Sequence, residues 1–299
     1  MAADPRVTVV VMTHNRRDEL ARSLGRLAAL PERPPVIVVD NGSADGTAAM
    51  VRRRYPGMQL IAARRNLGAV ARNVAVRRVT TPYVAFCDDD TWWEPGSIAR
   101  AADVLDAHPD VAVVTARIVV EPDGTDDPIV PELAGSPVPG RPGLPGPALM
   151  SFLAGASVLR TGPFRAAGGF SPRLWLGGEE ELLAADLVSS GHVLCYLADA
   201  VVHHQASRLR DPSRRRWLGI RNTLWFTWLR RPPAAALRRT AELARTVPPD
   251  RTSAVAFGAA VAGLPWVMRE RRPVPPHVES WIQFLEEPRR ASQARRYVG

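Results

Sequence analysis

The chain has 299 residues, and its apolar share of 46% is enough for a sizeable buried core, so it is a globular protein. All 39 basic residues are arginine, and together with 30 acidic residues they give a formal net charge of +9. This charge favours partners that carry phosphate, such as nucleotides, anionic lipid headgroups or nucleic acid, without choosing among them.

Short β-branched runs alternate with helical stretches in the first third of the chain. Their apolar residues are consecutive rather than alternating with polar ones, which indicates strands that are buried on both faces and not strands with one solvent-exposed face. Strands are predicted at residues 7–12, 36–39, 58–62 and 83–87, and helices at 16–30, 44–54 and 69–79. This order predicts a doubly wound, mostly parallel sheet, whose ligands bind beyond the carboxyl ends of the strands.

The next part of the chain is less regular. A helix is predicted at 97–108 and a strand at 111–120, after which proline and glycine crowd residues 122–147. We expect a loop there, either an acceptor-side lid or a disordered insertion. Further elements are predicted at residues 152–159, at a turn formed by Gly168 and Gly169, in a helix starting near Glu180, and in strands at 193–197 and 201–203.

The composition changes after Ser207. We therefore predict one α/β domain over residues 1–207, with a nucleotide-binding half at about 1–120 and an acceptor half at about 121–207, and an appended helical region over 208–299.

Three features bear on the location of the protein. The N-terminus has no basic and apolar leader, so we expect a cytoplasmic protein. Cys87 and Cys195 lie in apolar runs and are predicted to be buried thiols rather than a disulfide. The most apolar window, residues 254–268, is shorter than the roughly 20 residues of a membrane span and contains Pro265.

Three consecutive aspartates follow the predicted strand at 83–87. Asp88, Asp89 and Asp90 stand where carboxylates can share a divalent cation with phosphate oxygens, and such hard ligands suit Mg²⁺ or Mn²⁺. Taken alone, an acidic turn that caps the following helix is the commoner explanation of this pattern.

The context of the triplet changes this assessment. Thr-His-Asn-Arg ends the first strand, Asp-Asn-Gly-Ser ends the second, and Arg-Asn-Leu-Gly precedes the third helix. In this order the motifs resemble those of the family 2 glycosyltransferases of the GT-A fold, and the resemblance covers roughly residues 7–207. It implies a GT-A type, Rossmann-like sheet and a nucleoside-diphosphate sugar as donor.

The resemblance also implies roles for particular residues. The nucleoside would be held by Thr13, Asn15 and Asp40, and the donor pocket would be shaped by Asn66, Gly68 and Arg72. Asp88 and Asp90 match the outer positions of the Asp-x-Asp motif and would bind the metal, with Asp90 the better candidate for direct contact. Asp89, in the middle, would touch the sugar or the ribose.

The acceptor half carries two further matches. Gly155 would allow the sugar to approach closely. Glu180 falls at the position that supplies the catalytic base in inverting members, and Glu179 and Glu181 are alternatives because successive helical residues point about 100° apart. Many relatives have an arginine where this helix has Asp186, and this departure bears on local pairing.

Two histidines close the predicted domain. His204 matches the terminal histidine of the family and would contact the metal or the diphosphate, with His203 as the alternative. A histidine at a strand end is by default a satisfied polar residue.

The implied reaction is a metal-assisted transfer of a hexosyl or deoxyhexosyl unit to an acceptor hydroxyl with inversion. The acceptor can be a glycan, a lipid-linked molecule or a small molecule, and no nucleic acid is expected. A single addition is predicted, because Ser213 replaces the glutamine of the Gln-x-x-Arg-Trp motif of processive relatives. The alternatives are a nucleotidyltransferase and a non-catalytic nucleotide-binding or scaffolding protein of the same fold.

A stripe of apolar residues follows in the C-terminal region. Trp217, Ile220, Leu224, Trp225 and Trp228 recur at helical spacing between arginine clusters. Such a helix can lie in an anionic membrane surface, which would make the protein peripheral at the inner face of the plasma membrane. The competing explanation is that the stripe packs against the protein's own core.

Overall fold

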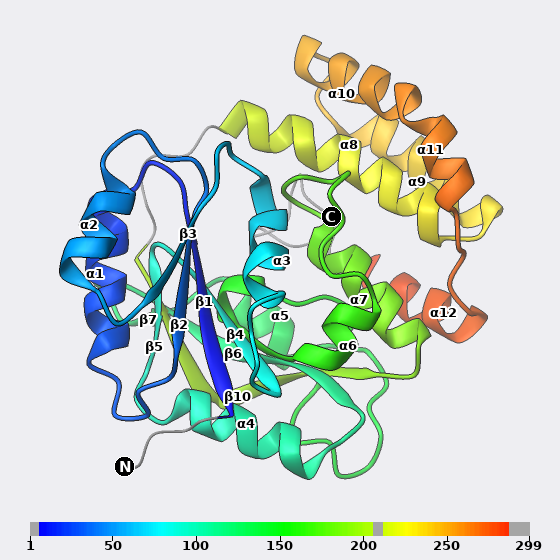
Figure 1. The fold of residues 1–299 in the computed structure, drawn as a ribbon. Coiled ribbons are helices and arrows are strands. Elements are labelled where there is room, and N and C mark those ends of the chain that lie inside the picture. Colours follow the sequence, from blue (N-terminus) through cyan, green and yellow to red (C-terminus); the bar gives the residue numbers. More distant parts are fainter. Residues whose placement is uncertain (1–5, 206–211, 287–299) are drawn as a thin grey trace.

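A sheet of ten strands forms the centre of the molecule (Figure 1). The structure, a computed structural model, describes residues 6–205 and 212–286. The main strand order is β3-β2-β1-β4-β9-β6-β10-β5, with β7 beside β6 and β8 beside β10. The strands are β1 (Val7–Thr13), β2 (Val36–Asp40), β3 (Gln59–Ala62), β4 (Tyr83–Asp88), β5 (Thr91–Trp93), β6 (Val111–Val120), β7 (Thr125–Asp126), β8 (Ala148–Leu149), β9 (Ser157–Arg160) and β10 (Val193–His204).

The strand register brings polar residues together at one edge of the sheet. β1 pairs in parallel with β2 and with β4, so that Thr13 lies beside Asp40 and Met12 beside Asp88. The antiparallel β9 separates these strands from the parallel pair β6 and β10. Each parallel strand pair has more paired residues than any antiparallel pair. The predicted α/β fold is confirmed, and its sheet is mixed, with the parallel pairings the longer ones.

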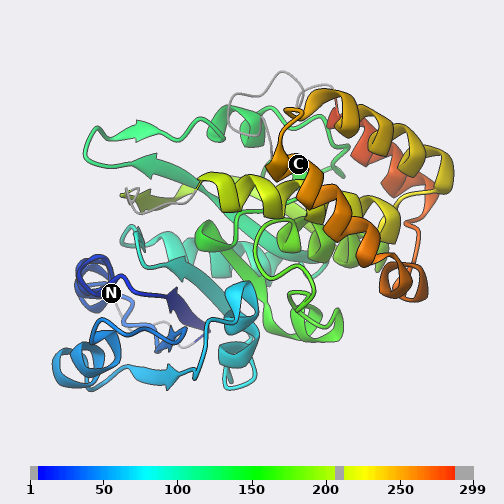
Figure 2. The same ribbon diagram turned by 90° about the horizontal axis from the view of Figure 1, so that it is seen from above.

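Helices cover both faces of the sheet. In Figures 1 and 2, α1 and α2 lie on one side of β1 to β3, and α3, α6 and α7 lie on the other. Leu20, Leu24 and Leu27 of α1 recur at helical spacing and are buried against the sheet. The helices of this part are α1 (Arg17–Ala28), α2 (Thr47–Arg54), α3 (Ala71–Val76), α4 (Ser97–Ala107), α5 (Val130–Ala134), α6 (Thr161–Ala166) and α7 (Glu179–Ser189).

Some predicted elements differ from the observed ones. The proline-rich stretch at 122–147 is ordered rather than a disordered insertion, since β7, α5 and a bridge between Val138 and Ala148 lie within or beside it. The two strands predicted at 193–197 and 201–203 are one strand, β10, with an irregularity between Leu197 and Val201. Cys87 and Cys195 are buried free thiols, as predicted.

The C-terminal region is helical, as predicted. It contains α8 (Pro212–Arg230), α9 (Pro233–Thr246), α10 (Arg251–Ala262), α11 (Leu264–Glu270) and α12 (Pro276–Phe284). The predicted domain boundary at residue 207 lies outside the described residues. Ile220, Leu224 and Trp225 of α8 belong to the same buried core as the sheet.

The prediction that the aromatic stripe of α8 lies in a membrane surface is wrong. Ile220, Leu224 and Trp225 are buried, and the Trp225 indole N–H donates to the Ala260 carbonyl at 3.0 Å. The indole N–H of Trp228 donates to Thr240 Oγ1 at 3.1 Å. The stripe therefore packs inside the protein. Within the described ranges, none of the helices is both long and apolar enough to cross a bilayer.

Asp186, the residue that departs from the family pattern, has a partner in this region. Arg230 at the end of α8 donates from Nε and Nη2 to the two carboxylate oxygens of Asp186, at 2.5 and 2.9 Å. This two-point ion pair fixes α8 against α7.

Candidate functional site

The loops after β1 and β2 are tied to each other. The Asn15 backbone N–H donates to Ser43 Oγ at 2.9 Å, and Asn15 Oδ1 accepts from the Ala44 N–H at 2.8 Å. Asn15 has a positive φ of 52°, which asparagine tolerates better than most residues. Asp40 is buried and accepts from the Ser43 N–H at 2.9 Å. The three predicted nucleoside-binding residues therefore lie close together, with Thr13 and Asp40 at the ends of the paired strands β1 and β2 and Asn15 in the loop after β1.

The Asn-Leu-Gly turn lies next to these loops and is held by a residue that the sequence analysis did not assign. Asn41 Nδ2 donates to Asn66 Oδ1 at 3.0 Å and to the Gly68 carbonyl at 3.1 Å, and its Oδ1 accepts from the Leu67 N–H at 2.7 Å. Gly68 has a φ of +63°, and a side chain there would overlap the Trp175 carbonyl. The turn thus requires glycine and packs against the loop before α7.

The three aspartates point in different directions. Asp88 forms an ion pair with the buried Arg72. Asp89 accepts from Thr13 Oγ1 at 2.9 Å and from Arg16 Nη1 at 2.9 Å. Asp90 is also close to Arg16, at 3.3 Å. The triplet therefore faces both the Arg72 side and the Arg16 side of the strand end.

Glu180 lies beside Asp88, although the two residues are far apart in the sequence. Glu180 Oε1 accepts from the Ala154 N–H at 2.7 Å. The next residue, Gly155, is packed so closely against Asp88 that a Cβ atom would lie 2.6 Å from Asp88 Oδ2. Among the three neighbouring glutamates, Glu180 is partly exposed whereas Glu179 and Glu181 are buried. Asp88, Arg72, Gly155 and Glu180 thus form one cluster.

Three carboxyl groups in or near this cluster, those of Glu180, Glu179 and Asp89, have raised pKa values. Burial, together with the charge of Glu179, raises the pKa of Glu180 to about 8, and the Ala154 N–H and Arg72 partly oppose the shift. Burial also raises the pKa of Glu179. The pKa of Asp89 rises to about 7 because the carboxyl is buried, with Arg16 acting in the opposite direction.

The two histidines at the end of β10 have different surroundings. His204 Nε2 lies 3.9 Å from Asp90 Oδ1, and its Nδ1 lies 3.9 Å from Asp127 Oδ2. His203 instead contacts Glu121 Oε1 through Nδ1 at 2.8 Å and stacks on Trp92. Only His204 lies beside an aspartate of the triplet.

The predicted ligands Asp88, Asp90 and His204 do not form one cluster. Over residues 6–205 and 212–286, no three His, Cys, Asp or Glu side chains are grouped as a metal site requires. The reason is the ion pair of Asp88 with Arg72, which holds this carboxylate against Gly155. Asp90 and His204 remain together, and the 3.9 Å between their ligating atoms is short enough for both to contact one small divalent cation at ligand distances of about 2.0–2.2 Å.

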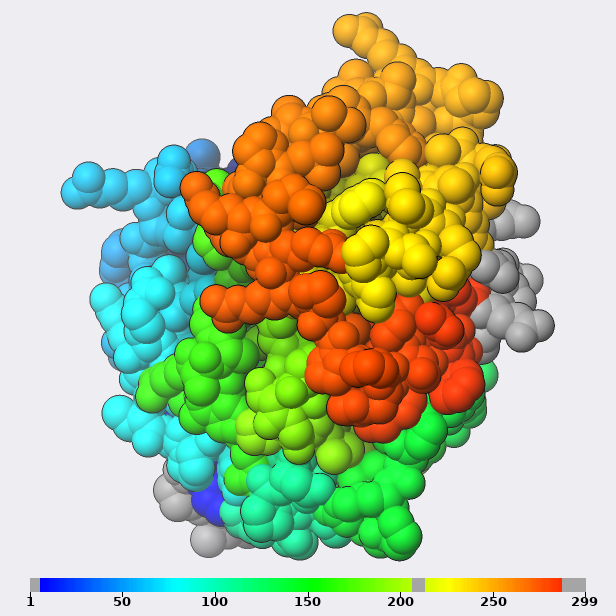
Figure 3. Space-filling view, turned by 90° about the vertical axis from the view of Figure 1, so that its right-hand side faces the viewer, coloured from blue at the N-terminus to red at the C-terminus, as the bar shows by residue number. Residues whose placement is uncertain are grey.

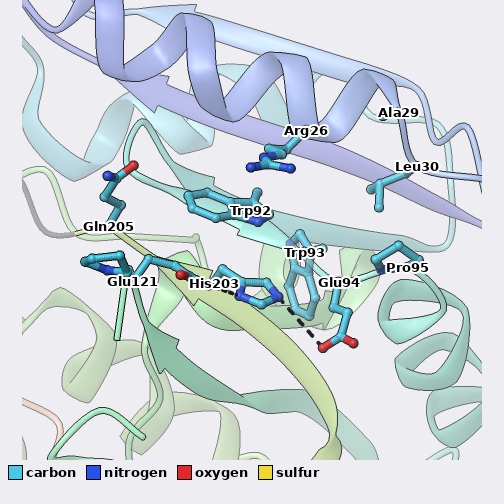
Figure 4. Close-up of a pocket in the computed structure, with 11 residues that line it drawn as sticks. Arg26, Ala29, Leu30, Trp92, Trp93, Glu94, Pro95, Glu121, His203 and Gln205 are labelled. Carbon is cyan, nitrogen blue, oxygen red and sulfur yellow. Dashed lines mark hydrogen bonds and ion pairs between the residues drawn. The ribbon is translucent and has the colours of Figure 1, made fainter. Parts of the chain in front are cut away.

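A separate cavity of about 490 Å³ lies between the end of α1 and the strands β5 and β10 (Figure 4). Its lining includes Arg26, Trp92, Glu94, Glu121 and His203. Trp92 is flanked by the Arg26 guanidinium at 5.7 Å and by the His203 ring at 5.5 Å. None of the predicted catalytic, donor or metal residues except the alternative His203 lines this cavity.

Sequence reasoning missed several residues that hold the site together. Arg16 and Asn41 are part of the motifs. Nothing in the sequence showed that Arg16 pairs with the aspartates or that Asn41 holds the Asn-Leu-Gly turn. Trp175 and Asn222 had no signal, because their contacts depend on how the C-terminal helix packs. Asn222 Nδ2 donates to the Leu174, Leu176 and Gly177 carbonyls at 2.9, 3.0 and 2.6 Å.

The fold and the cluster of acidic side chains at the strand ends are those of a nucleotide-dependent transferase. Residues 8–166, more than half of the chain, match the family model "Glycosyl transferase family 2". The protein belongs to this family and is a glycosyltransferase.

Known proteins show the same relationship. The chain is 28% identical over 241 residues to an N-acetylglucosaminyl-diphospho-decaprenol L-rhamnosyltransferase of Mycobacterium tuberculosis, covering 69% of this chain and 78% of the relative. Among solved structures it is similar to the mannosyltransferase PcManGT of Pyrobaculum calidifontis in complex with GDP-Man and Mn²⁺, with a TM-score of 0.60, 21% identity and coverage of 95% and 88% of the two chains. GalNAc-T7 with UDP, GalNAc and Mn²⁺ has a TM-score of 0.62 at 13% identity, with coverage of 89% and 56%. These two structural likenesses support the GT-A fold.

Proposed function

We propose that this enzyme transfers one hexosyl or deoxyhexosyl unit from a nucleoside-diphosphate sugar to an acceptor hydroxyl, with inversion and with the help of a divalent cation. The observation that carries the proposal is the cluster around Gly155, where a candidate base, Glu180, lies beside the first aspartate of the triplet. A donor bound next to this cluster would have the candidate base on one side and the aspartate triplet on the other.

The donor would lie over the carboxyl ends of β1, β2 and β4. Thr13 and Asp40 end two paired strands, Asn15 lies in the loop after β1, and these three residues would hold the nucleoside. Asn66 and Gly68 form the turn next to them, and Gly155, which has no side chain, lets Asp88 pack closely against this part of the site. Arg72 supplies a buried positive charge beside Asp88, and Asp89, through Thr13, connects the triplet to the nucleoside side of the site.

Asp90 and His204 are the residues that would hold the cation. A carboxylate oxygen and an imidazole nitrogen suit Mn²⁺, and the oxygen also suits Mg²⁺. Asp88 would join them only after leaving Arg72. Two of the similar solved structures are complexes with Mn²⁺, which supports the same cofactor here. When bound, the ion offsets the negative charge that develops on the departing diphosphate.

Glu180 would act as the general base. Its carboxylate removes the proton from the acceptor hydroxyl while that oxygen forms a bond to the anomeric carbon. The bond from this carbon to the diphosphate oxygen breaks on the opposite face, and the electron pair leaves with the nucleoside diphosphate. No covalent intermediate is needed. A pKa raised to about 8 by burial makes Glu180 a stronger base than an ordinary glutamate once it is ionised.

We further propose a lipid-linked acceptor. The support is the Mycobacterium tuberculosis relative, whose name describes transfer of rhamnose to a sugar on decaprenyl diphosphate. Such an acceptor would place the enzyme at the cytoplasmic face of a membrane, as a peripheral protein.

Hydrolysis of a panel of nucleotide sugars with and without Mn²⁺ tests the proposal. A glycosyltransferase should hydrolyse one or a few nucleotide sugars slowly and only with the metal. A nucleotidyltransferase would instead release pyrophosphate from a nucleoside triphosphate and a sugar phosphate. A non-catalytic protein of the same fold would bind a nucleotide without any turnover, and either result would refute the proposal.

A further inference from the structure

The helix α10 has no polar face. Residues 251–268, which form α10 and most of α11, contain no acidic residue and only one charged residue, Arg251. Ser253, Ala256 and Ala260 of α10 are buried, while the opposite side of the helix is exposed. A helix that is apolar all round normally has apolar surroundings on every side, either protein or lipid.

Both α10 and the helix that follows it, α11, have exposed apolar residues. We call these residues the α10–α11 surface, which is formed by Ala254, Val255, Gly258, Val261, Pro265 and Met268. Val255, Val261 and Met268 are 51%, 62% and 54% exposed, values that are high for large apolar side chains. Figure 3 shows these helices in orange, beside α9 in yellow and above α12 in red.

Arginines lie at both ends of the α10–α11 surface. Arg251 begins α10 and is exposed. At the other end, the Arg269 side chain is 71% exposed and lies 3.7 Å from Glu270 Oε1, and Arg272 is exposed as well, so that Arg269, Arg271 and Arg272 outnumber the one glutamate. An apolar strip with cations at its two ends matches a bilayer surface, where acyl chains lie beneath a layer of phosphate groups.

A second copy of the chain fits this surface less well. Two copies packed antiparallel across α10 would bring the Arg251 end of one towards the Arg269 end of the other. Arg251 would then meet an end where Arg269, Arg271 and Arg272 outnumber Glu270, and this net like charge is unfavourable where water is excluded.

The α10–α11 surface is also connected to the acceptor side of the site. Arg173, in the loop that leads to α7 and Glu180, lies over the Trp266 ring of α11 at 5.3 Å. Its Nη2 is 3.7 Å from Glu270 Oε1 at the end of the same helix. A membrane that contacts α11 would therefore lie close to the loop that precedes the candidate base.

We propose that the α10–α11 surface docks on an anionic lipid bilayer, with its apolar residues among the acyl chains and Arg251 and Arg269 against lipid phosphates. The inference rests on the proposed function in one respect, namely that the acceptor is lipid-linked. It replaces α8 by α10 and α11 as the part of the protein that meets the membrane.

Co-sedimentation with vesicles of phosphatidylcholine and increasing phosphatidylglycerol tests the proposal without donor or acceptor. Wild-type binding should rise with the anionic lipid and weaken with salt. The variant Val255→Asp/Val261→Asp should bind at least about tenfold more weakly, because two carboxylates would enter the apolar strip. Arg251→Gln and Arg269→Gln should each lower the partition coefficient about fivefold. Phe284→Asp, at an equally exposed apolar position of α12, is the matched control and should bind as wild type does.

Nucleotide-sugar hydrolysis in the absence of vesicles, measured on the same preparations, separates this proposal from the proposed function. Intact hydrolysis with loss of vesicle binding in Val255→Asp/Val261→Asp supports docking, and so does the same loss of binding if hydrolysis is absent throughout. Wild-type protein that stays in the supernatant with anionic vesicles at low salt overturns the proposal. So does a wild-type dimer that Val255→Asp/Val261→Asp dissociates without any change in vesicle binding.

Discussion

At the scale of single residues, neighbouring carboxylates of similar intrinsic chemistry have different surroundings. Asp88 is paired with Arg72, Asp89 is buried beside Thr13 and Arg16, and Asp90 lies next to His204. The sequence could predict an acidic site at the end of β4, because three consecutive aspartates follow a strand that is recognisable from its apolar run. It could not predict which side chain each aspartate faces, because Arg16, Arg72 and His204 come from other elements that only the folded sheet brings near.

We predict that Asp90→Ala lowers the transfer rate by at least about 10²-fold and abolishes Mn²⁺-dependent donor binding, because the carboxylate that would bind the cation is removed. Titration of Mn²⁺ followed by electron paramagnetic resonance, with and without a nucleoside diphosphate, measures the binding step directly. His204→Ala should weaken Mn²⁺ binding, whereas His203→Ala, whose ring contacts Glu121 and Trp92, should not. Wild-type Mn²⁺ affinity in Asp90→Ala would falsify the metal assignment.

For Glu180, we predict normal donor affinity and a transfer rate about 10²- to 10⁴-fold lower in Glu180→Gln, because the base is removed while its shape is kept. Glu179→Gln and Glu181→Gln should lose less. If Glu181→Gln is the inactive variant, the assignment of the base among the three glutamates is wrong by one residue.

The same residue predicts a pH dependence. A base must be deprotonated, and burial raises the pKa of Glu180 to about 8, so activity should fall as the pH drops below this value. The expected loss in kcat/KM is about tenfold per pH unit on the acid side. Glu180→Gln should lack this limb, which separates it from titration of Asp89, whose pKa is about 7. A wild-type profile that is flat from pH 6 to pH 8 contradicts the assignment.

At the scale of elements, the strands that the sequence predicts well are those with continuous apolar runs. Val7, Val9, Val10 and Val11 are fully buried, as a strand covered on both faces requires. β5 was missed because it has three residues and exists only by pairing with β10, more than a hundred residues away. The aromatic stripe of α8 was ambiguous for a related reason, since helical periodicity shows an apolar face but not what covers it.

The element that connects the C-terminal region to the site is α8. Asn222 holds three carbonyls of the loop between Leu174 and Gly177, directly before the glutamates, and Arg214 lies over the Trp175 ring at 4.4 Å. The Trp175 carbonyl in turn accepts from the Ala69 N–H at 2.6 Å, directly after the Asn-Leu-Gly turn. α8 therefore positions the loop that presents Glu180.

We predict that Asn222→Ala lowers kcat about tenfold or more with little change in the KM for the donor, because buried carbonyls lose their donors and the loop shifts. Steady-state kinetics and the melting temperature together measure the effect. Trp228→Phe, which removes one hydrogen bond of α8 to Thr240 away from the loop, is the control and should lower stability without lowering kcat. Equal kcat losses in both variants would mean that Asn222 acts only through general stability.

At the scale of the whole molecule, the C-terminal helices close one side of the domain. They carry the segment that predicts the transfer of a single sugar to each acceptor. Ser213 stands in place of the glutamine of the Gln-x-x-Arg-Trp motif, and the Trp217 of that motif is covered by the Arg221 guanidinium at 4.6 Å. We predict one added sugar per acceptor, as mass spectrometry of the product will show. A ladder of homopolymer from purified protein is the contrary result.

The central claim is direct displacement of the diphosphate by an acceptor oxygen that Glu180 deprotonates, and the configuration of the product tests it most directly. The measurement is the proton NMR coupling constant of the anomeric hydrogen, recorded early in the reaction with the donor that the hydrolysis panel identifies and with Mn²⁺ present. The account predicts the anomer opposite to that of the donor, because a single displacement inverts the carbon. A first-formed product with the donor's own configuration would contradict the role given to Glu180.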